Sequence, residues 1–468
     1  MGNADTMQLI GMGVTLAVFV AIGLLSGKLV KTKEDFYVAG GSFGALSVAG
    51  AASGTYIGGG TVIGTAQLAF TDGFSAMYFA IGCCCSMLLT ALVFSAKVRD
   101  SGKQTIQEMV LSEFGPSAGL LATLLGILAL YINNISHLFS GISLIGSVFP
   151  DLSVVSGAII TAALIFVCAC LGGFWGMSLI NILKTTILLS TAVISAAIIF
   201  VVTGNLSDIA AAVPERFFTF CPRGAGTDLG NLVSVMLGIL SSQTTIQAVF
   251  SARSNRDCRR GFLMGAILLP VAGISCSIIG AYMRTTVPDL EPLQAFPYFV
   301  LTHTNGLLSG VILATTMIAV ASAGVSIMLG IAGIVVNNLY LRFRPNAGTR
   351  EQLGLSRLVI LCCLCLSTFI ISKGVGNEIM QYNFLSMGMR CTVLFMPMCA
   401  FLFFPGRVSR RCAIASIAVG PVALLLGKFA IPLPFDCIFF ALAVCAAIML
   451  LGVVDQKLIN KSQIGDVK

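Results

Sequence analysis

Charged side chains are scarce in this sequence of 468 residues. Asp, Glu, Lys and Arg together make up 10% of it, whereas soluble proteins carry about 25%. So little charge in a chain that is 57% hydrophobic excludes a water-soluble protein. Histidine is also rare, and the two copies, His137 and His303, lie too far apart in the sequence for an HExxH zinc motif. We therefore expect a membrane protein that is not an enzyme.

Long apolar runs account for most of the chain. Thirteen of them reach about 18 residues, which is enough to cross a bilayer as a helix. The sequence therefore predicts an all-α integral membrane protein with thirteen transmembrane helices. The runs are 7–26, 45–70, 75–97, 117–148, 152–172, 176–203, 231–250, 261–283, 307–336, 355–373, 378–404, 412–430 and 435–453.

Basic residues outnumber acidic ones by 27 to 19. In so apolar a chain this surplus indicates membrane topology, and we expect no nucleic-acid partner. If successive loops alternate between the two faces of the membrane, 20 of the 27 basic residues fall on one face. The positive-inside rule makes that face cytoplasmic, with the N-terminus outside and the C-terminus inside. We expect a plasma membrane location, most simply the bacterial inner membrane.

The sixteen cysteines do not form a metal-binding or disulfide pattern. Several are adjacent within apolar runs, as in Cys83, Cys84 and Cys85. We interpret them as reduced, small, buried or lipid-facing side chains. The sequence thus predicts no cofactor, and it contains no signal for an oligomeric state.

The number of spans allows two related halves. If 45–203 holds five spans and 231–404 holds another five, the odd number forces the two units into opposite orientations. Inverted repeats of this kind are a hallmark of secondary transporters. The remaining parts are 1–44, with one extra helix, the outer loop 204–230, and 405–468, with two extra helices and a short tail. A channel would instead be expected to show a repeated filter or a ring of charges.

Glycines interrupt the second span. Four occur within seven residues, at Gly54, Gly58, Gly59 and Gly60, and each costs a helix about 1 kcal/mol. This pattern favours a helix that is broken near mid-membrane and leaves carbonyl groups free. The alternative is a continuous helix that crosses a neighbour closely through its small residues.

With these features the chain resembles the sodium:solute symporter family, whose core has the fold of the leucine transporter. The resemblance covers most of the sequence, and no single motif decides it. It is carried by the order and spacing of Asp35-Phe36-Tyr37-Val38-Ala39-Gly40-Gly41, the broken helix, Gly172-Gly173, Gln243 and Gln247, and the segment from Ala319 to Tyr340.

The resemblance implies a sodium site formed by backbone carbonyls and two hydroxyls. The matching carbonyls are those of Gly54, Ile57 and Ala319, and one matching hydroxyl is that of Ser322. The second hydroxyl position holds Ala323 in this chain. Because sodium prefers oxygen ligands, we expect a weakened site.

A second departure from the family lies in the sixth span. The family usually has an Asp and, three residues later, a Gln, where this chain has Asn181 and Lys184. In ion-independent or proton-coupled relatives of the fold, a lysine of this helix places its ammonium where sodium would sit. Lys184 is therefore a candidate replacement for the ion, linked to the loss of the hydroxyl at Ala323. Alternatively, Lys184 extends to the cytoplasmic headgroups.

Arg390 lies near the middle of the span 378–404, where a charge costs about 2.5 to 3.5 kcal/mol. All acidic residues map to loops or span ends, so a carboxylate partner inside the bilayer is missing. A guanidinium matches a carboxylate in shape and charge, which points to an anionic solute. The alternative is a structural role in which Arg390 binds helix-end carbonyls or waters.

Further polar residues fall where the core helices should meet. We expect Thr55 and Tyr56 at the break, Gln243 in the seventh span, and Asn134 and His137 in the fourth to line a substrate pocket. His137 could instead form a hydrogen bond between helices. The sequence therefore predicts a secondary transporter that imports a small, carboxylate-bearing solute, most simply with sodium. Proton-coupled or ion-independent transport, with Lys184 in place of sodium, is the alternative.

Overall fold

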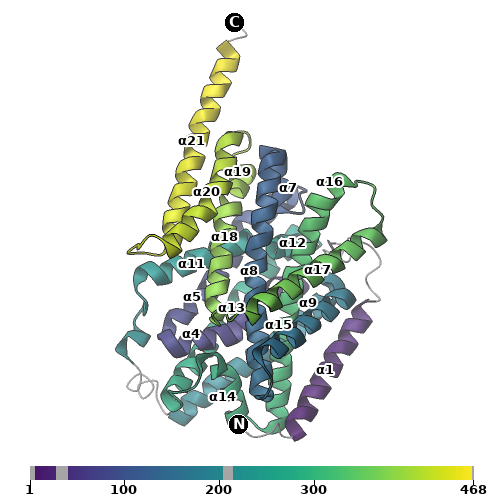
Figure 1. The fold of residues 1–468 in the computed structure, drawn as a ribbon, viewed down its shortest axis with the longest axis vertical. Coiled ribbons are helices and arrows are strands. Elements are labelled where there is room, and N and C mark those ends of the chain that lie inside the picture. Colours follow the sequence, from purple (N-terminus) through teal and green to yellow (C-terminus); the bar gives the residue numbers. More distant parts are fainter. Residues whose placement is uncertain (1–5, 28–40, 204–213, 466–468) are drawn as a thin grey trace.

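The structure is a computed structural model that describes residues 6–27, 41–203 and 214–465. Within these ranges the chain forms helices and connecting loops, and one isolated bridge pairs Phe43 with Ala252. In Figure 1 the C-terminal helix α21 extends from the upper end of the molecule, and α1 lies at the lower right. The prediction of an all-α protein is confirmed for the described residues. The motif Asp35 to Gly40 lies outside them.

The helices of the first half begin with α1 and end with α9, which contains both of the expected spans 152–172 and 176–203. They are α1 (Thr6–Gly27), α3 (Ala45–Tyr56), η2 (Gly60–Gly64), α4 (Thr65–Asp72), η3 (Gly73–Ala76), α5 (Met77–Leu89), η4 (Thr90–Phe94), α6 (Ser95–Asp100), α7 (Ile106–Phe114), α8 (Pro116–Val148) and α9 (Val154–Thr203). Of these, η2 and η4 are π-helical.

The second half adds two broken or kinked spans and two C-terminal helices. Its elements are η5 (Glu215–Phe218), α11 (Ala225–Leu240), α12 (Gln243–Ser251), α13 (Asn255–Thr286), η6 (Pro292–Gln294), α14 (Ala295–His303), α15 (Gly306–Ile334), η7 (Val335–Tyr340), α16 (Leu341–Phe343), α17 (Thr349–Ser372), α18 (Ile379–Arg390), η8 (Cys391–Phe395), α19 (Met396–Phe403), α20 (Arg410–Phe429) and α21 (Cys437–Gly465).

Nine helical segments in the described part are long and apolar enough to cross a membrane. The bent pair α11 and α12 makes a tenth, and the shorter apolar stretches Thr6–Ile22 and Val154–Cys170 lie at two of the remaining expected positions. The expected total of thirteen spans is thus not established. Among the described spans α15 is the most deeply buried, so it lies at the centre of the helix assembly.

The second span is interrupted where the glycines predict it. Helix α3 ends at Tyr56, and the backbone becomes helical again as a π-helix at Gly60. At the break the amide of Gly58 donates to the carbonyl of Tyr56 at 3.0 Å, so it does not bond the carbonyl of Gly54 as it would in a regular α-helix. The prediction of a broken helix is confirmed, and the alternative of a continuous helix is wrong.

A second break separates α11 from α12. The two helices meet at Ser241 and Ser242 with a bend of 48°. Ser242 has an extended backbone, which ends the first helix and starts the next. The first helices of the two expected repeats are therefore both discontinuous, as is common in transporters with inverted repeats.

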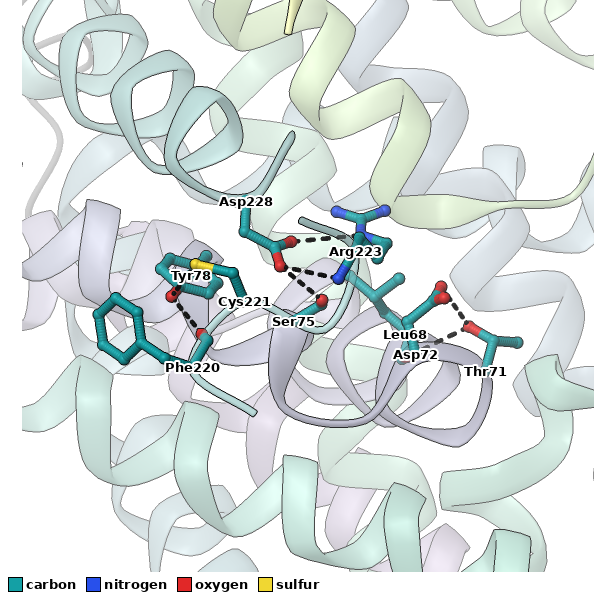
Figure 2. Close-up of polar contacts among 9 residues, drawn as sticks. All are labelled: Leu68, Thr71, Asp72, Ser75, Tyr78, Phe220, Cys221, Arg223 and Asp228. Carbon is teal, nitrogen blue, oxygen red and sulfur yellow. Dashed lines mark hydrogen bonds and ion pairs between the residues drawn. The ribbon is translucent and has the colours of Figure 1, made fainter. Parts of the chain in front are cut away.

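Hydrogen bonds fasten a loop to the end of α11 that lies opposite α12 (Figure 2). Asp228 in the first turn of α11 accepts from the amide and the Nε atom of Arg223 and from Ser75 Oγ at 3.0 Å. The Tyr78 hydroxyl donates to the carbonyl of Phe220 at 2.5 Å and lies 3.2 Å from Cys221 Sγ. These contacts join the loop 219–224 and the start of α11 to η3 and α5, so the helix that follows the first break is tied to the helix that precedes the second.

Candidate functional site

A small cavity lies between the two breaks and has a volume of about 20 Å³. This is room for about one water molecule. Most of its lining residues have polar side chains, although the surrounding helices are predominantly apolar. The lining residues are Thr55, Tyr56, Gly60, Thr61, Phe79, Asn133, His137, Ser242, Thr244, Ile327, Asn383, Met387 and Arg390.

Tyr56 connects the two broken helices directly. Its hydroxyl lies 3.0 Å from Thr244 Oγ1 and 3.1 Å from Thr245 Oγ1, both in the first turn of α12. The carbonyl of Tyr56 also accepts a hydrogen bond from the Thr61 hydroxyl, which bridges the break. The polar ends of two interrupted helices thus face one cavity, an arrangement that supplies hydrogen-bonding groups inside an otherwise apolar protein.

Arg390 reaches this cavity from the last turn of α18 and is 3% exposed. Its Nη1 atom donates to Ser242 Oγ at 2.9 Å, and its Nη2 and Nε atoms donate to Ser386 Oγ at 3.2 Å and the Ser386 carbonyl at 3.3 Å. The guanidinium therefore joins α18 to the break between α11 and α12. Its partners are hydroxyl and carbonyl groups and the Met387 Sδ atom, so its positive charge is not neutralised by a carboxylate among the lining residues.

Asn383 presents a hydrogen-bond donor to the break in the second span. Its Oδ1 atom accepts from Asn133 Nδ2 at 2.7 Å and from Ser136 Oγ at 2.8 Å. The amide oxygen therefore faces α8, because only the oxygen can accept, and Nδ2 donates to Met380 Sδ at 3.8 Å. The Nδ2 atom lies at Gly60, where an added Cβ would come within 2.6 Å of it. The amide nitrogen thus faces the interrupted backbone.

His137 lies in the same cavity wall and is buried, and its Nδ1 atom is without a hydrogen-bond partner in the described part of the chain. A Cβ at Gly58 would lie 3.8 Å from the ring. In the residues that the structure describes, no group of three or more His, Cys, Asp and Glu side chains is placed to hold a metal ion.

Lys184 is completely buried, and its ammonium donates a hydrogen bond to Ser322 Oγ. Ser322 in turn donates to the carbonyl of Ala319 at 3.1 Å. The ammonium thus contacts one of the groups that the family resemblance assigns to sodium. The alternative in which Lys184 extends to the headgroups is wrong, because the side chain points into the protein and has no exposed surface.

The same region contains the other residues that the resemblance assigns to the ion. A Cβ at Gly58 would lie 3.0 Å from Ala323 Cβ and 3.4 Å from the carbonyl oxygen of Ala319. A Cβ at Gly54 would lie only 2.5 Å from Asn181 Cβ. Ile57 lies between these two glycines and is fully buried. The break therefore packs against both α9 and α15, and only glycine fits at Gly54.

Two of the predicted pocket residues lie elsewhere. Asn134 donates from Nδ2 to Ser367 Oγ of α17 at 3.2 Å, away from the central cavity. Gln243 donates from Nε2 to the carbonyl of Gln104 at 2.9 Å, in the loop that precedes α7. Thr55, Tyr56, His137 and Arg390 do line the cavity, as expected from the sequence.

Asn383 is a cavity residue that was not predicted from the sequence. Its position was readable in part, because it precedes Arg390 by seven residues, which places both side chains on one face of a helix two turns apart. Asn133 and Ser242 lie within polar runs of the fourth and seventh spans. In each run several neighbouring residues are polar, and their spacing does not indicate which one faces the cavity.

Comparison with known proteins gives a consistent result. Residues 36–420 match the sequence profile of the sodium:solute symporter family. A Na⁺-coupled sialic acid symporter, solved in a substrate-bound, outward-open state, has a TM-score of 0.81 at 16% identity, covering 97% of this chain and 98% of the other.

Two further solved structures share the fold. A transporter of the nucleobase-cation-symport-1 family, solved in a closed conformation with bromovinylhydantoin bound, has a TM-score of 0.58 at 15% identity, covering 92% of this chain and 96% of the other. The manganese transporter of Eremococcus coleocola has a TM-score of 0.51 at 13% identity, with the same coverage of 92% and 96%. At these identities the likeness concerns the fold alone.

Proposed function

Because this chain belongs to the sodium:solute symporter family, we propose that it imports a small polar, anionic organic solute by alternating access. Family membership confirms that the protein is a multi-pass membrane transporter and not an enzyme. The solute class and the transport cycle are our proposal. They rest on the central cavity and on the two broken helices that enclose it.

The proposal of an anionic solute is based mainly on the buried guanidinium of Arg390. Its charge lies in the wall of the central cavity, and none of the described lining residues is acidic. An unpaired buried cation is costly, and a solute carboxylate would lower that cost through charge-assisted hydrogen bonds. A cationic solute would be repelled. The hydroxyl of Ser242 holds the guanidinium in place through Nη1.

Asn383 supports the same assignment from the opposite side of the cavity. Its amide oxygen is already used twice by α8, so the group it offers is the Nδ2 donor. A donor amide and a guanidinium together favour a solute that is rich in acceptor atoms, such as a carboxylate with a neighbouring carbonyl or hydroxyl oxygen.

Alternating access requires two units that move relative to each other, and the expected inverted repeats provide them. We propose that 45–203 and 231–404 form these repeats, each beginning with a broken helix. The complete arrangement would then have thirteen spans, with 1–44 and 405–468 outside the repeats and 204–230 as an outer loop. The N-terminus would face outward and the C-terminus the cytoplasm, in the bacterial inner membrane.

Sodium is the coupling ion that family membership favours. The proposed ligands are the carbonyls of Gly54, Ile57 and Ala319 and the hydroxyl of Ser322, with Ala323 in place of a second hydroxyl. All of these residues are buried where α3, α9 and α15 meet. Oxygen ligands of this kind suit a hard cation, and the missing hydroxyl would weaken the site.

One contact favours a second candidate, in which the Lys184 ammonium takes the place of sodium. The Nζ atom of Lys184 already donates to Ser322. Ala323 lacks the second hydroxyl that would bind sodium, and the ammonium of Lys184 does not require that hydroxyl as a ligand. Transport would then be coupled to protons or proceed without an ion gradient. This candidate changes the coupling and leaves the solute class and the cavity unchanged.

Two measurements test these proposals together. A thermal-shift screen of purified protein with carboxylates, neutral analogues and amines identifies the solute class, because a bound ligand stabilises the folded protein. Uptake into proteoliposomes is then measured with an imposed sodium gradient, a proton gradient, or neither. Stabilisation by amines only would contradict the anionic solute. Uptake that a sodium gradient stimulates supports sodium coupling. Uptake that does not change with sodium supports the candidate in which Lys184 replaces the ion.

A further inference from the structure

A second, larger cavity of about 650 Å³ lies at one end of the molecule. It is enclosed by α7, the first two turns of α8, and the π-helix η7 with α16. Figure 1 shows α7 and α16 near the upper end of α8. Lys97 and Arg99 of α6 and Arg342 of α16 belong to this end, which the positive-inside rule assigns to the cytoplasm.

The wall of this cavity contains polar atoms that lack partners. Gln107 is 2% exposed, and its Oε1 atom is buried without a hydrogen bond in the described part of the chain. Asn338 Nδ2 in η7 is in the same situation. One is an acceptor and the other a donor, so the wall can bind a polar solute that carries both kinds of group. π-Helical turns such as η7 also occur frequently at functional sites.

Two helices connect this cavity with the central one. On α8, Thr123 lines the larger cavity and Asn133 the central cavity. On α15 and η7, Asn337 lines the larger cavity and Ile327 the central one. Both pairs are ten residues apart, which is about 15 Å along a helix. The two cavities therefore follow each other along the same pair of helices.

Gln243 occupies the space between them. It is buried, and both of its sequence neighbours, Ser242 and Thr244, line the central cavity. Its Nε2 atom donates to the carbonyl of Gln104, a residue that lines the larger cavity. A Cβ at Gly330 would lie 4.0 Å from its side chain, and Gly330 is located between Ile327 and Asn337 on the connecting helix. Its Oε1 atom has no partner among the described residues.

We propose that Gln243 is the partition between the central cavity and the larger cavity, and that the larger cavity is the compartment through which the solute reaches the cytoplasm. The hydrogen bond to Gln104 closes the partition, and breaking it joins the two cavities. The unpartnered Oε1 atom is a group that a departing solute can engage. The direction of solute movement rests on the proposed transport function. The separation of the two cavities by Gln243 does not depend on that function.

The test uses a thiol reagent and needs no knowledge of the solute. Ser242→Cys places a thiol in the central cavity, and Asn337→Cys places one in the larger cavity. Inside-out vesicles are exposed to 2-sulfonatoethyl methanethiosulfonate, an anionic reagent that does not cross membranes. The rate of modification is followed by mass spectrometry of the peptide that carries each new thiol, so the native cysteines do not interfere.

We expect Asn337→Cys to react rapidly and Ser242→Cys slowly. Adding Gln243→Ala should raise the rate at Ser242→Cys at least about ten-fold and leave Asn337→Cys unchanged. Gln243→Met, which keeps the length and removes the donor, should give an intermediate rate and carries the test if the alanine variant does not fold. The matched control is Gln247→Ala, one turn further along α12 and equally buried.

Equal rates at Ser242→Cys with and without the changes at Gln243, or an equal increase with Gln247→Ala, would overturn the partition. A slow reaction at Asn337→Cys would overturn the cytoplasmic opening of the larger cavity. If these labelling results fail while the parent protein still takes up solute, only the partition is refuted. If the labelling results hold and the parent takes up no carboxylate, the proposed function fails instead.

Discussion

Lys184 and Ser322 are joined by a hydrogen bond in the interior of the protein, between α9 and α15. The Lys184 side chain has no exposed surface, and the Ser322 hydroxyl donates a hydrogen bond to the Ala319 carbonyl. The amino group of Lys184 is therefore held at the junction of these helices with the break in the second span. This single contact links the unusual residues at 184 and 323, which are 139 positions apart and would be unrelated without the fold.

The double variant Lys184→Ala with Ala323→Ser removes the ammonium and restores the second hydroxyl. We expect sodium stimulation of the initial uptake rate to increase at least about five-fold over the parent, since one added ligand contributes about 1 kcal/mol. The measurement is uptake into proteoliposomes in sodium and in choline buffers. Ala323→Ser alone is the control, because the ammonium still occupies the position. Unchanged or lower sodium stimulation in the double variant would contradict the shared site.

Arg390→Gln should remove solute binding without unfolding the protein. The change deletes a charge that contributes about 1.5–3 kcal/mol to a charge-assisted hydrogen bond, so affinity for an acidic solute should fall at least ten-fold. The measurement is the ligand-induced thermal shift, followed by uptake. The control is Arg284→Gln, because Arg284 lies at the end of α13 and bonds the Pro288 carbonyl. Unaltered affinity in Arg390→Gln would rule out the anion site.

Asn383→Asp should convert the fixed donor at Gly60 into a negative acceptor. Because Asn133 and Ser136 continue to bond the Oδ1 position, the second carboxylate oxygen faces the cavity. We expect uptake of an anionic solute to fall at least about ten-fold through loss of a hydrogen bond and charge repulsion. Asn134→Ser is the comparison, since Asn134 bonds Ser367 outside the cavity, and its uptake should stay within two-fold of the parent. A reversed order of effects would restore Asn134 as the pocket residue.

Gly59→Ala should destabilise the break by overpacking. An added Cβ would lie 2.4 Å from Ser140 Cβ and 2.6 Å from a methyl group of Val320, and such overpacking typically costs about 1–3 kcal/mol. We expect a lower melting temperature in detergent. Gly13→Ala in α1 meets no atom within 4 Å, so its melting temperature should equal or exceed that of the parent. Equal melting temperatures for the two variants would show that the break adapts to a side chain.

Asp436 should make stability depend on pH. It lies between α20 and α21, outside the helical spans, and burial raises the pKa of its carboxyl group. A group whose pKa is raised on folding contributes stability below its unfolded pKa and loses it as the pH rises through the folded value. We expect the melting temperature to rise as the pH falls from 7 toward 4. Asp436→Asn keeps the acceptor for the Ile438 amide at 2.9 Å and should reduce this dependence. An identical pH profile in both proteins would exclude Asp436 as its source.

The interruption of the second span and the membrane character could be predicted from the sequence because each follows from local composition, whereas the break at Ser241 and Ser242 has no such glycine signal. Four glycines within seven residues weaken a helix wherever it lies, and a run of about 20 apolar residues crosses a bilayer in any fold. Thr105 likewise caps the short helix α7 by accepting from the Glu108 amide, a local signal that the structure retains.

The cavity could be predicted only in part, because it depends on the rotation of each helix about its axis. From Asn133 to Ile145, α8 is buried on every side, so it has no apolar stripe to indicate which face meets which neighbour. Asn133 and Asn134 were therefore indistinguishable, although one bonds Asn383 and the other Ser367. Gln243 was predicted to line the pocket, but it bonds Gln104, which is 139 residues away and comes close only through folding.

The central cavity of about 20 Å³ is too small for any organic carboxylate. Binding of such a solute therefore requires the lining residues to move apart, and the contacts that hold them together include those of Tyr56 and Arg390 across the two breaks. The association rate constant should consequently lie well below the diffusion limit. It should depend mainly on how easily the contacts across the two breaks rearrange. The transporter would then select among solutes partly by whether the binding free energy of each one exceeds the free-energy cost of this rearrangement.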